Sequence, residues 1–415
     1  MTEAPPRSPS ALAALPRVLL VTDVDLSPGS RGAGRTLVNL FSRYPSDRLL
    51  AISSSAATPL EMAAGQRVLA AAPRLPGRVT TALRQHVGHV DAAWVRLRPL
   101  RDRAAIASFA PELVLAVPTH PVGLALAERC RAPVPLVTYL MDDWLAFESG
   151  VPLAFDARRR GRDLLRASSA WLAISPYLAT SMRAFAGVER PAHVVHNAVP
   201  IGDAEPTALA APRPGRFRVA YAGSVWPMHW DAVAAVAQGV QRLRESGTDI
   251  EFVLFTDRYF WGRYEADWRR WGVVDGGLIP YTQLGASLGA CDVLVVASSF
   301  ELSQAHMSRS SIQTKVTDYM AAGRPILACG PAQAASNEFL RGHNCAFFAE
   351  DPAPAAIDAA LRACVDARAA GPAMARRAWD VVRRDYALAG VTDRLYAFLA
   401  EAARTYIPCD DRLPL

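Results

Sequence analysis

Lysine is almost absent from this chain. Of its 45 lysine and arginine residues, only Lys315 is a lysine. Arginine presents a planar fork of donors, whereas lysine presents a compact, strongly hydrated point charge. The sequence therefore singles out Lys315 as a position where guanidinium does not serve, for example because a ligand phosphate must be reached along a narrow path. The alternative is chance, since a GC-rich coding bias replaces lysine with arginine throughout a chain.

Cysteine pairs and long apolar runs are also missing. The cysteines are scattered and no two form a C-x-x-C pair, which excludes a disulfide framework and a zinc site and favours a reduced, cytosolic compartment. They are Cys130, Cys291, Cys329, Cys345, Cys364 and Cys409. No run reaches the roughly 18 apolar residues of a membrane span. Residues 1–16 are rich in proline, alanine and serine, and their apolar part is too short for a signal sequence, so we predict a disordered tail there.

The net charge of +6 is modest, but arginines gather in one stretch with few acids between them. They are Arg74, Arg78, Arg84, Arg96, Arg98, Arg101 and Arg103. One interpretation is a solvated helical face. The other is a patch that meets anionic lipid or an anionic acceptor. Nucleic acid is not expected as a partner, because no aromatic residues interleave with the arginines and no binding motif accompanies them.

The length of 415 residues exceeds that of a usual single core and predicts two domains. Strand-like and helical segments alternate in both halves, which is typical of parallel sheets with helices on both faces. We therefore predict an α/β fold with two doubly wound, Rossmann-like domains facing a central cleft. The predicted order is an N-terminal domain over 17–200, a linker over 201–216, a C-terminal domain over 217–385, a helix over 386–406 that packs back on the N-terminal domain, and a tail over 407–415.

In each half, a glycine-containing loop follows the first predicted strand. The first contains Gly32 and Gly34, directly before a helix, where backbone N–H groups and the helix N-terminus favour an anion. It is neither a P-loop nor the dinucleotide fingerprint, and a flexible turn is the alternative. The second contains Gly223 and Ser224, which offer N–H and hydroxyl donors to a phosphate.

The lysine segment predicts a further anion contact. If residues 311–322 are helical, Lys315 and Asp318 share a face. Such a pair is commonly a surface ion pair that contributes less than about 1 kcal/mol. The functional alternative places Lys315 on a diphosphate and Asp318 on ribose hydroxyls.

Acids and a histidine follow two predicted strands of the first half. Asp142 and Asp143 come directly after one of them, where a carboxylate can bind acceptor hydroxyls, act as a base or hold a cation. Neighbouring side chains point to different sides, so we expect only one of the two at the ligand edge. His120 follows another strand and is a candidate for acceptor binding. Helix capping for the acids and a structural role for the histidine are the alternatives.

Taken together, these segments resemble the nucleotide-sugar glycosyltransferases of the GT-B fold, and most of all family 4 (group 1). The stretch from Thr314 to Pro325 is similar to the "SK-x-x-EYMAAGKPV" segment of some members, and 196–199 (His-Asn-Ala-Val) is similar to "PNGV". The resemblance implies that Lys315 contacts donor phosphate and that Asp318 contacts donor ribose. The chain departs from the family at Ser310, where a glutamate is common, near Met141, where many members have histidine, and after Gly223, where an Arg/Lys pair is missing.

The resemblance implies a glycosyltransferase that moves a sugar from a nucleoside-diphosphate sugar to a glycan, lipid-linked or other acceptor, with retention, in surface polysaccharide or glycoconjugate synthesis. Its predicted catalytic residues are Asp142, Asp143 and Lys315. Donor binding is predicted for Gly32, Gly34, Gly223, Ser224, Thr314, Lys315 and Asp318, and acceptor binding for His120 and Asp142. No metal or cofactor is expected, and the predicted location is cytoplasmic, with peripheral contact to an anionic membrane as an option. Two other functions stay open, namely a sugar-nucleotide epimerase of the same fold and a non-catalytic partner of a polysaccharide assembly complex.

Overall fold

The computed structural model describes most of the chain in two compact units. The described residues are 15–56, 59–62, 64–70, 87–97, 103–145, 152–202, 205–209 and 215–405. One unit comprises the chain up to Ala198 together with the segment from Leu388 onward, and the other comprises Val199–Ala387.

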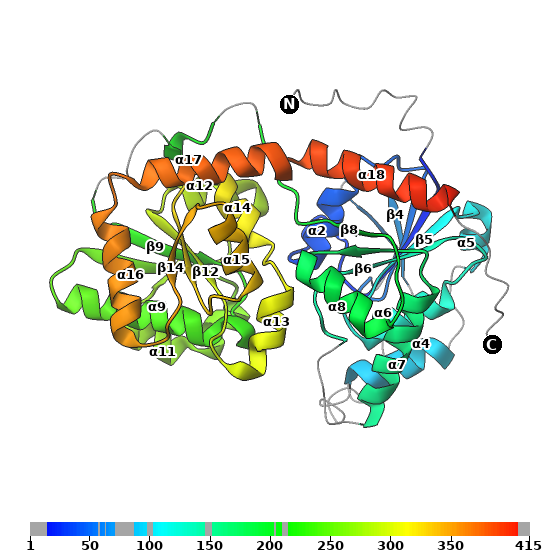
Figure 1. Ribbon diagram of the computed structural model, residues 1–415, viewed down its shortest axis with the longest axis horizontal. Helices are drawn as coiled ribbons and strands as arrows, with labels where there is room; N and C mark the ends of the chain where they lie inside the picture. Colours follow the sequence, from blue (N-terminus) through cyan, green and yellow to red (C-terminus); the bar gives the residue numbers. More distant parts are fainter. Residues whose placement is uncertain are drawn as a thin grey trace. The chain divides into compact units, whose positions relative to one another are not determined.

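The first unit is built on an eight-stranded sheet in the order β3-β4-β2-β1-β5-β6-β7-β8 (Figure 1). Only β3 pairs antiparallel, with β4, and the other pairs are parallel. The strands are β1 (Val18–Thr22), β2 (Leu49–Ser53), β3 (Leu60–Glu61), β4 (Arg67–Ala70), β5 (Leu113–Val117), β6 (Leu136–Leu140), β7 (Ala170–Ala173) and β8 (Ala192–Val194). Every residue of β1, β2, β5, β6 and β7 is buried, as expected for parallel strands covered on both faces.

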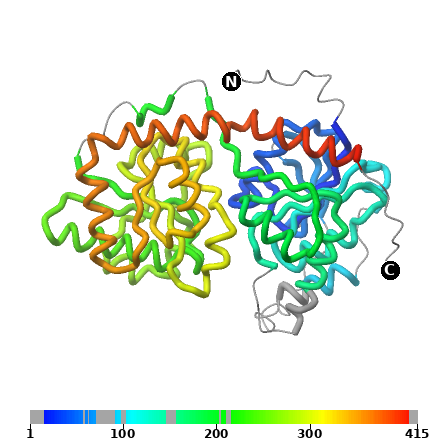
Figure 2. The backbone as a smooth tube through the Cα atoms, viewed as in Figure 1, coloured from blue at the N-terminus to red at the C-terminus, as the bar shows by residue number. Residues whose placement is uncertain are grey.

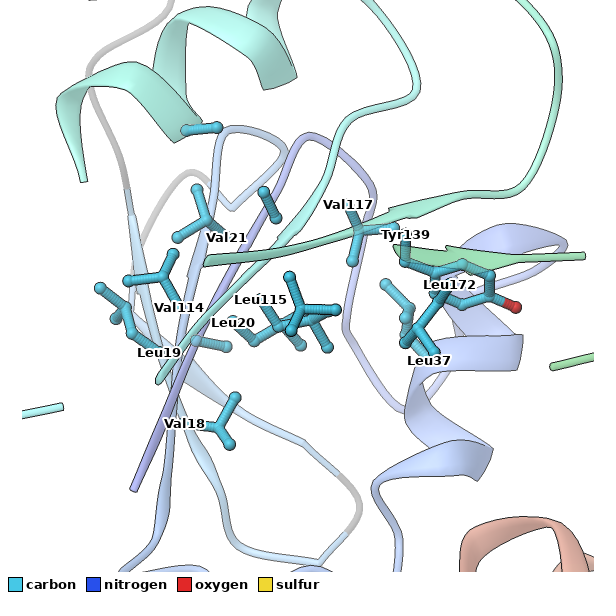
Figure 3. Close-up of a cluster of buried hydrophobic side chains, with 14 of the residues drawn as sticks. Val18, Leu19, Leu20, Val21, Leu37, Val114, Leu115, Val117, Tyr139 and Leu172 are labelled. Carbon is cyan, nitrogen blue, oxygen red and sulfur yellow. The ribbon is translucent and has the colours of Figure 1, made fainter. Parts of the chain in front are cut away.

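Helices cover this sheet, and the apolar side chains between the layers form one continuous core. The helices are α2 (Ala33–Leu40), α4 (Val87–Leu97), α5 (Arg103–Phe109), α6 (Pro121–Arg129), α7 (Pro152–Ala167), α8 (Pro176–Ala186) and α18 (Leu388–Arg404). Figure 3 shows part of this core, in which Leu20 of β1 lies beside its strand partner Leu115 of β5, and Leu37 of α2 belongs to the same cluster. Each fully buried leucine of this kind contributes roughly 1.5–3 kcal/mol to folding.

The last helix, α18, packs on the first unit through a cluster of aromatic rings. Tyr396 of α18 meets Tyr44 edge to face, with ring centres 4.9 Å apart. Its hydroxyl donates to the carbonyl of Leu40 at 2.9 Å, at the end of α2. Tyr44 in turn donates to the carbonyl of Pro16 at 2.6 Å. Figure 2 shows α18 and α2, from opposite ends of the sequence, side by side.

The second unit is built on a six-stranded, wholly parallel sheet in the order β11-β10-β9-β12-β13-β14. Its strands are β9 (Phe217–Ala222), β10 (Ile250–Phe255), β11 (Val274–Asp275), β12 (Val293–Ala297), β13 (Ile326–Cys329) and β14 (Ala346–Ala349). Counted within the unit, this is the order 3-2-1-4-5-6 of the Rossmann fold.

The helices of the second unit lie on both faces of its sheet (Figure 1). They are α9 (Pro227–Glu245), α10 (Arg258–Arg263), α11 (Glu265–Trp271), α12 (Leu284–Gly289), α13 (Ala305–Ser310), α14 (Lys315–Ala321), α15 (Ala335–Gly342), α16 (Pro354–Asp366) and α17 (Gly371–Val381). Short η turns occupy Thr207–Leu209, Tyr281–Gln283 and Leu302–Gln304, and a π-helical turn, Val382–Tyr386, follows α17. None of the helices in the described residues has the length and apolarity that a bilayer crossing requires.

The predicted fold class is confirmed, because both units are doubly wound parallel α/β sheets. In each sheet the strand order reverses once, between β1 and β5 in the first unit and between β9 and β12 in the second. Ligands of such sheets bind outside the carboxyl ends of the strands at this reversal. The segments that follow these four strands are therefore the candidate ligand sites.

Several details differ from the sequence prediction. Strands β3, β4 and β11 are additional, and α14 begins at Lys315 rather than at Ser311. Part of the stretch predicted as a linker packs on the second unit, where Pro206 and Leu209 lie so close to Gly323 that a Cβ there would come within 2.9 and 3.0 Å of them.

Candidate functional site

The turn after β9 is held by the side chain of the strand's own penultimate residue. Tyr221 is fully buried, and its hydroxyl donates to the carbonyl of Ser224 at 2.8 Å. Gly223, between them, has a φ of 127°, a backbone conformation that disfavours any residue with a Cβ. The tyrosine and the glycine together fix the shape of the loop at the reversal of the sheet.

Helix α14 is placed against this turn by a second tyrosine. The hydroxyl of Tyr319 accepts from the backbone N–H of Ala222 at 2.8 Å and donates to the carbonyl of Ala222 at 3.2 Å. Tyr319 lies four residues after Lys315, so both side chains extend from the same face of the helix. Docking of Tyr319 on the end of β9 therefore brings Lys315 to Gly223.

Lys315 reaches into the turn with its charged end buried. Its ammonium Nζ lies 3.6 Å from the centre of the Tyr221 ring, a cation–π contact. A Cβ on Gly223 would lie 3.1 Å from Nζ, so the glycine leaves the space that the ammonium occupies. Among the residues that the structure describes, Nζ has no hydrogen-bond partner and is shielded from solvent. A buried ammonium without a partner is costly, and the first turn of a helix disfavours a cation further.

The pKa values of Lys315 and its neighbour His229 reflect this cost. Burial lowers the pKa of Lys315 well below its ordinary value. His229, in the first turn of α9, donates from Nδ1 to the carbonyl of Ser224 at 3.2 Å. Burial, and then the charge of Lys315, lower the pKa of His229 to about 3, so the ring is neutral at physiological pH. An anion bound beside Nζ would relieve the cost of the buried ammonium.

The other predicted donor-binding residues of this unit take varied positions. The N–H of Gly223 donates to the carbonyl of Phe255 at 2.9 Å, so it is not available to a phosphate, contrary to our expectation. Ser224 is half-buried in the same turn, and Thr314 directly precedes α14. Asp318 is half-buried in the first turn of α14, one turn from Lys315. The structure thus brings Gly223, Ser224 and Lys315 together.

In the first unit, other polar side chains lie where the strand order reverses, between β1 and β5. Asp23 directly follows β1, and sequence reasoning missed it because a single acid after a strand carries no motif. Its side chain is 4% exposed, and Oδ2 faces Nδ1 of His120, after β5, at 3.4 Å. Oδ1 accepts from the backbone N–H of Thr119 at 2.8 Å and from the Thr119 hydroxyl at 3.1 Å. The topology of the sheet therefore joins an acid and a histidine that lie far apart in the sequence.

The two acids after β6 have different surroundings. Asp143 is buried, with 3% of its surface exposed, and accepts a hydrogen bond from the Ser181 hydroxyl of α8. Asp142 is half-buried, and its charge contributes to raising the pKa of His120. The side-chain interaction with Asp23 is the largest cause of that rise. The charge of Asp142 therefore acts on His120. Asp143 instead links the segment after β6 to α8 through its hydrogen bond with Ser181.

The glycine loop of the first unit is tightly built. A Cβ on Gly34 would lie 2.0 Å from the carbonyl oxygen of Asp25, so only glycine lets α2 approach the loop. Gly32 begins the helix with a φ of 53°. Arg35 turns back on the loop and donates to the carbonyl of Ser30 at 3.2 Å and to that of Pro28. Close packing at Gly34 and the backbone conformation of Gly32 therefore account for both glycines without a ligand.

The predicted arginine patch lies mostly outside the described residues, which include only Arg96 and Arg103 of its members. Arg96 pairs with Glu128 of α6 at 3.2 Å, and Arg103 is exposed. In the described part of the chain no three His, Cys, Asp or Glu side chains are grouped as metal ligands would be. Five of the six cysteines are described, and all five are buried thiols that form no disulfide within the described residues.

Comparison with known proteins yields structural neighbours but no sequence relatives. No protein-family model and no curated protein sequence matches the chain. HepE of Anabaena, solved with UDP, is 16% identical with a TM-score of 0.63 over 93% of this chain and 100% of its own. Sucrose-phosphate synthase of Thermosynechococcus elongatus is 12% identical, with a TM-score of 0.69 and coverage of 93% and 100%. Trehalose-6-phosphate synthase of E. coli, solved with UDP-2-fluoro glucose, is 9% identical, with a TM-score of 0.63 and coverage of 94% and 100%.

These neighbours establish the fold. The chain has the GT-B architecture of two Rossmann-like domains, matched over nearly its whole length. Identities of 9–16% define the fold alone, so the activity rests on the residues of the site.

Proposed function

We propose that this protein is a glycosyltransferase that takes a sugar from a nucleoside-diphosphate sugar, with the diphosphate bound beside Lys315. The observation that carries the proposal is the buried Nζ of Lys315, which has no hydrogen-bond partner among the described residues. It lies where the parallel sheet of the second unit reverses, the usual place for a nucleotide in such a sheet. A diphosphate supplies the negative charge and the acceptor oxygens that this ammonium lacks.

The proposed chemistry uses this charge on the leaving group. When the bond between the sugar and the diphosphate breaks, negative charge develops on the departing phosphate oxygen. A fixed, partly desolvated ammonium stabilises such charge more strongly than water does. In the proposal Ser224 adds a hydroxyl donor, and Asp318 accepts from the ribose. No metal or cofactor has a role in it.

The finer parts of the proposal concern the acceptor. We infer a glycan or lipid-linked acceptor in surface polysaccharide or glycoconjugate synthesis, with retention at the anomeric carbon, from the resemblance of residues 314–325 to family 4. NMR of the product formed from an α-linked donor tests retention, which predicts an α-linked product. Flotation with liposomes containing anionic lipid tests the membrane contact, and absence of binding would remove it.

The neighbours support donor use, because HepE was solved with UDP-glucose and with UDP and glucose. The rival functions make different predictions. An epimerase would convert the donor without any acceptor. A non-catalytic partner would bind the nucleotide and neither hydrolyse nor transfer its sugar.

The test begins with thermal shift of the purified protein against a panel of nucleoside diphosphates and their sugars. We expect stabilisation by at least one of them, and transfer to an acceptor with release of the diphosphate. Lys315→Ala should reduce turnover by roughly 100-fold or more, the size seen when one charge-stabilising donor is removed. Lys315→Arg should also impair it, because a fork does not replace a point charge in a closed space. Near-normal turnover by folded Lys315→Ala would reject the assignment.

A further inference from the structure

Two aromatic side chains of the second unit are exposed just after the ends of neighbouring strands. Trp226 is 47% exposed and Tyr259 is 63% exposed. Each comes four residues after a strand, Trp226 after β9 and Tyr259 after β10, and the last residues of these strands, Ala222 and Phe255, are register partners in the sheet. Both aromatic residues therefore lie at the carboxyl edge of the sheet, where ligands of such folds bind.

One buried ring contacts both of them. Phe260 of α10 is 4% exposed, and it meets Trp226 edge to face with ring centres 4.7 Å apart and Tyr259 edge to face at 5.1 Å. Pro227, at the start of α9, restricts Trp226 to the extended backbone that it adopts, with a φ of −70° and a ψ of 162°. We call these three rings the aromatic platform. Because the platform is preformed, a ligand binds to it at a low cost in entropy.

The core of the unit does not explain why two rings are exposed. Other aromatic residues around α9 and α11 pack on one another, with Trp230 stacked on Tyr264 at 3.6 Å and edge to face with Trp268 at 5.1 Å. A large apolar side chain left in water forgoes the roughly 1.5–3 kcal/mol that its full burial contributes. The exposed faces of Trp226 and Tyr259 are therefore free to contact a ligand.

The surroundings of the platform favour a sugar ring over a protein partner. Two aromatic side chains bury at most about 150–250 Å² each, far less than the roughly 800 Å² that each partner of a stable protein interface buries. Polar groups adjoin the rings, since Ser224 is half-buried two residues before Trp226 and the exposed Arg258 directly precedes Tyr259. A pyranose has an apolar C–H face that packs on an aromatic face, and hydroxyls around it that take hydrogen bonds.

We propose that the aromatic platform binds a pyranose ring by stacking, with Trp226 as the main contact. The proposal deepens the proposed function and rests on it, because it adds a sugar subsite next to the turn where the diphosphate is proposed to bind. Two molecules carry such a ring, namely the donor, whose sugar is joined to the diphosphate, and a saccharide acceptor. The two arms of the test distinguish these sources.

The first arm compares the calorimetric affinities for a nucleoside diphosphate and for its glucose conjugate. The nucleotide is the one that stabilises the protein most in the thermal-shift panel. If the donor supplies the ring, Trp226→Ala should weaken binding of the conjugate by about 2- to 10-fold and leave the affinity for the diphosphate unchanged. Trp226→Phe keeps an aromatic face and should recover most of the loss. Tyr177→Ala is the matched control, because it removes a ring that is 44% exposed on the first unit.

The second arm uses two free trisaccharides, maltotriose and cellotriose, and protein labelled with fluorotryptophan. The fluorine NMR signal of Trp226 is assigned by its loss in Trp226→Phe. If a saccharide acceptor supplies the ring, at least one trisaccharide should shift this signal. Tyr259→Ala should then weaken the binding by about 2- to 10-fold, whereas Tyr177→Ala should not.

The proposal is overturned if Trp226→Ala leaves the affinity for the conjugate unchanged and neither trisaccharide shifts the Trp226 signal. An equal loss of affinity for the diphosphate and its conjugate would also overturn it, because the ring would then act on the nucleotide or on the turn. The proposed function fails on a different result, the absence of any nucleoside diphosphate binding by the unaltered protein. The second arm needs no nucleotide, so it decides the proposal in that case too.

Discussion

The ammonium of Lys315 lies 3.6 Å from the centre of the Tyr221 ring and, within the described residues, makes no hydrogen bond. A cation–π contact stabilises a desolvated cation by on the order of 2 kcal/mol. This is only part of the hydration free energy that the ammonium loses on burial. The rest of the free-energy cost of burying the ammonium remains in the ligand-free protein. Such a buried, unpaired ammonium is suited to bind an anion, because the anion supplies the opposite charge and hydrogen-bond acceptors that replace the lost water.

The same relationship predicts that Lys315 lowers stability. Lys315→Met keeps an unbranched side chain over the Tyr221 ring and removes the buried charge, so the free energy of unfolding should rise by about 1–3 kcal/mol. The measurement is urea unfolding of the ligand-free protein, with Arg309→Met as a control for loss of a cation elsewhere. Nucleoside diphosphates should no longer stabilise the Lys315→Met variant. Destabilisation of Lys315→Met with a normal control would show that the ammonium has a favourable partner.

Gly223 offers a test of the space beside Nζ. Gly223→Ala adds a Cβ 3.1 Å from Nζ at a φ of 127°, so it should strain the backbone and displace the ammonium. Gly247→Ala is the matched control, because its φ is 95° and an added Cβ meets nothing within 4 Å. Both variants should lose stability by about 1–3 kcal/mol from the backbone alone. Only Gly223→Ala should weaken nucleotide binding, and equal affinities in calorimetry would contradict the proposed position of the diphosphate.

The role of Asp318 can be isolated by changing protein and ligand together. Asp318→Ala should weaken nucleoside diphosphate binding by about 1–3 kcal/mol if a hydrogen bond to a charged group is lost. Nucleoside diphosphates that lack the 2′- or the 3′-hydroxyl identify which ribose hydroxyl Asp318 binds. Asp318→Ala should not weaken binding of the analogue that lacks that hydroxyl any further. Calorimetry gives all the affinities. An undiminished effect of Asp318→Ala on both analogues would remove the ribose contact.

Much of the fold was predictable because strands of this kind are recognisable from local sequence. Runs such as residues 18–22 and 293–297 are short, apolar and followed by turn residues, and both became fully buried strands. Strands β3 and β11 were missed because each has only two residues. Lys315 was found because composition made it unusual.

The remaining parts of the site depend on tertiary contacts. Nothing local shows that the N–H of Gly223 donates to Phe255, since that hydrogen bond joins two neighbouring strands. Nor does spacing connect Asp23 with His120, because the sheet order β1-β5 brings them together. Acids at strand ends are common in sequence, and only the pairing of the strands shows which of them meet.

The last prediction concerns the pH dependence of nucleotide binding. Burial lowers the pKa of Lys315 in the ligand-free protein, and a bound diphosphate should raise it again. The complex then binds more protons than the free protein, so affinity should fall as pH rises between the free and the bound pKa, by up to about tenfold per unit. The range above about pH 7 is the informative one, because the terminal phosphate is already ionised there.

Calorimetry in buffers of different ionisation enthalpy measures this proton directly. We expect uptake of up to about one proton per nucleotide bound, falling to about zero in Lys315→Met. His229 does not compete as the source of the effect, because its pKa of about 3 keeps it neutral throughout the range. The ligand-free protein should also become more stable as pH rises from the folded pKa of Lys315 toward about 10.4, since the unfolded chain binds the extra proton there. Binding without proton uptake across this range would mean that Lys315 stays charged in the ligand-free protein, and that it has a partner other than the nucleotide.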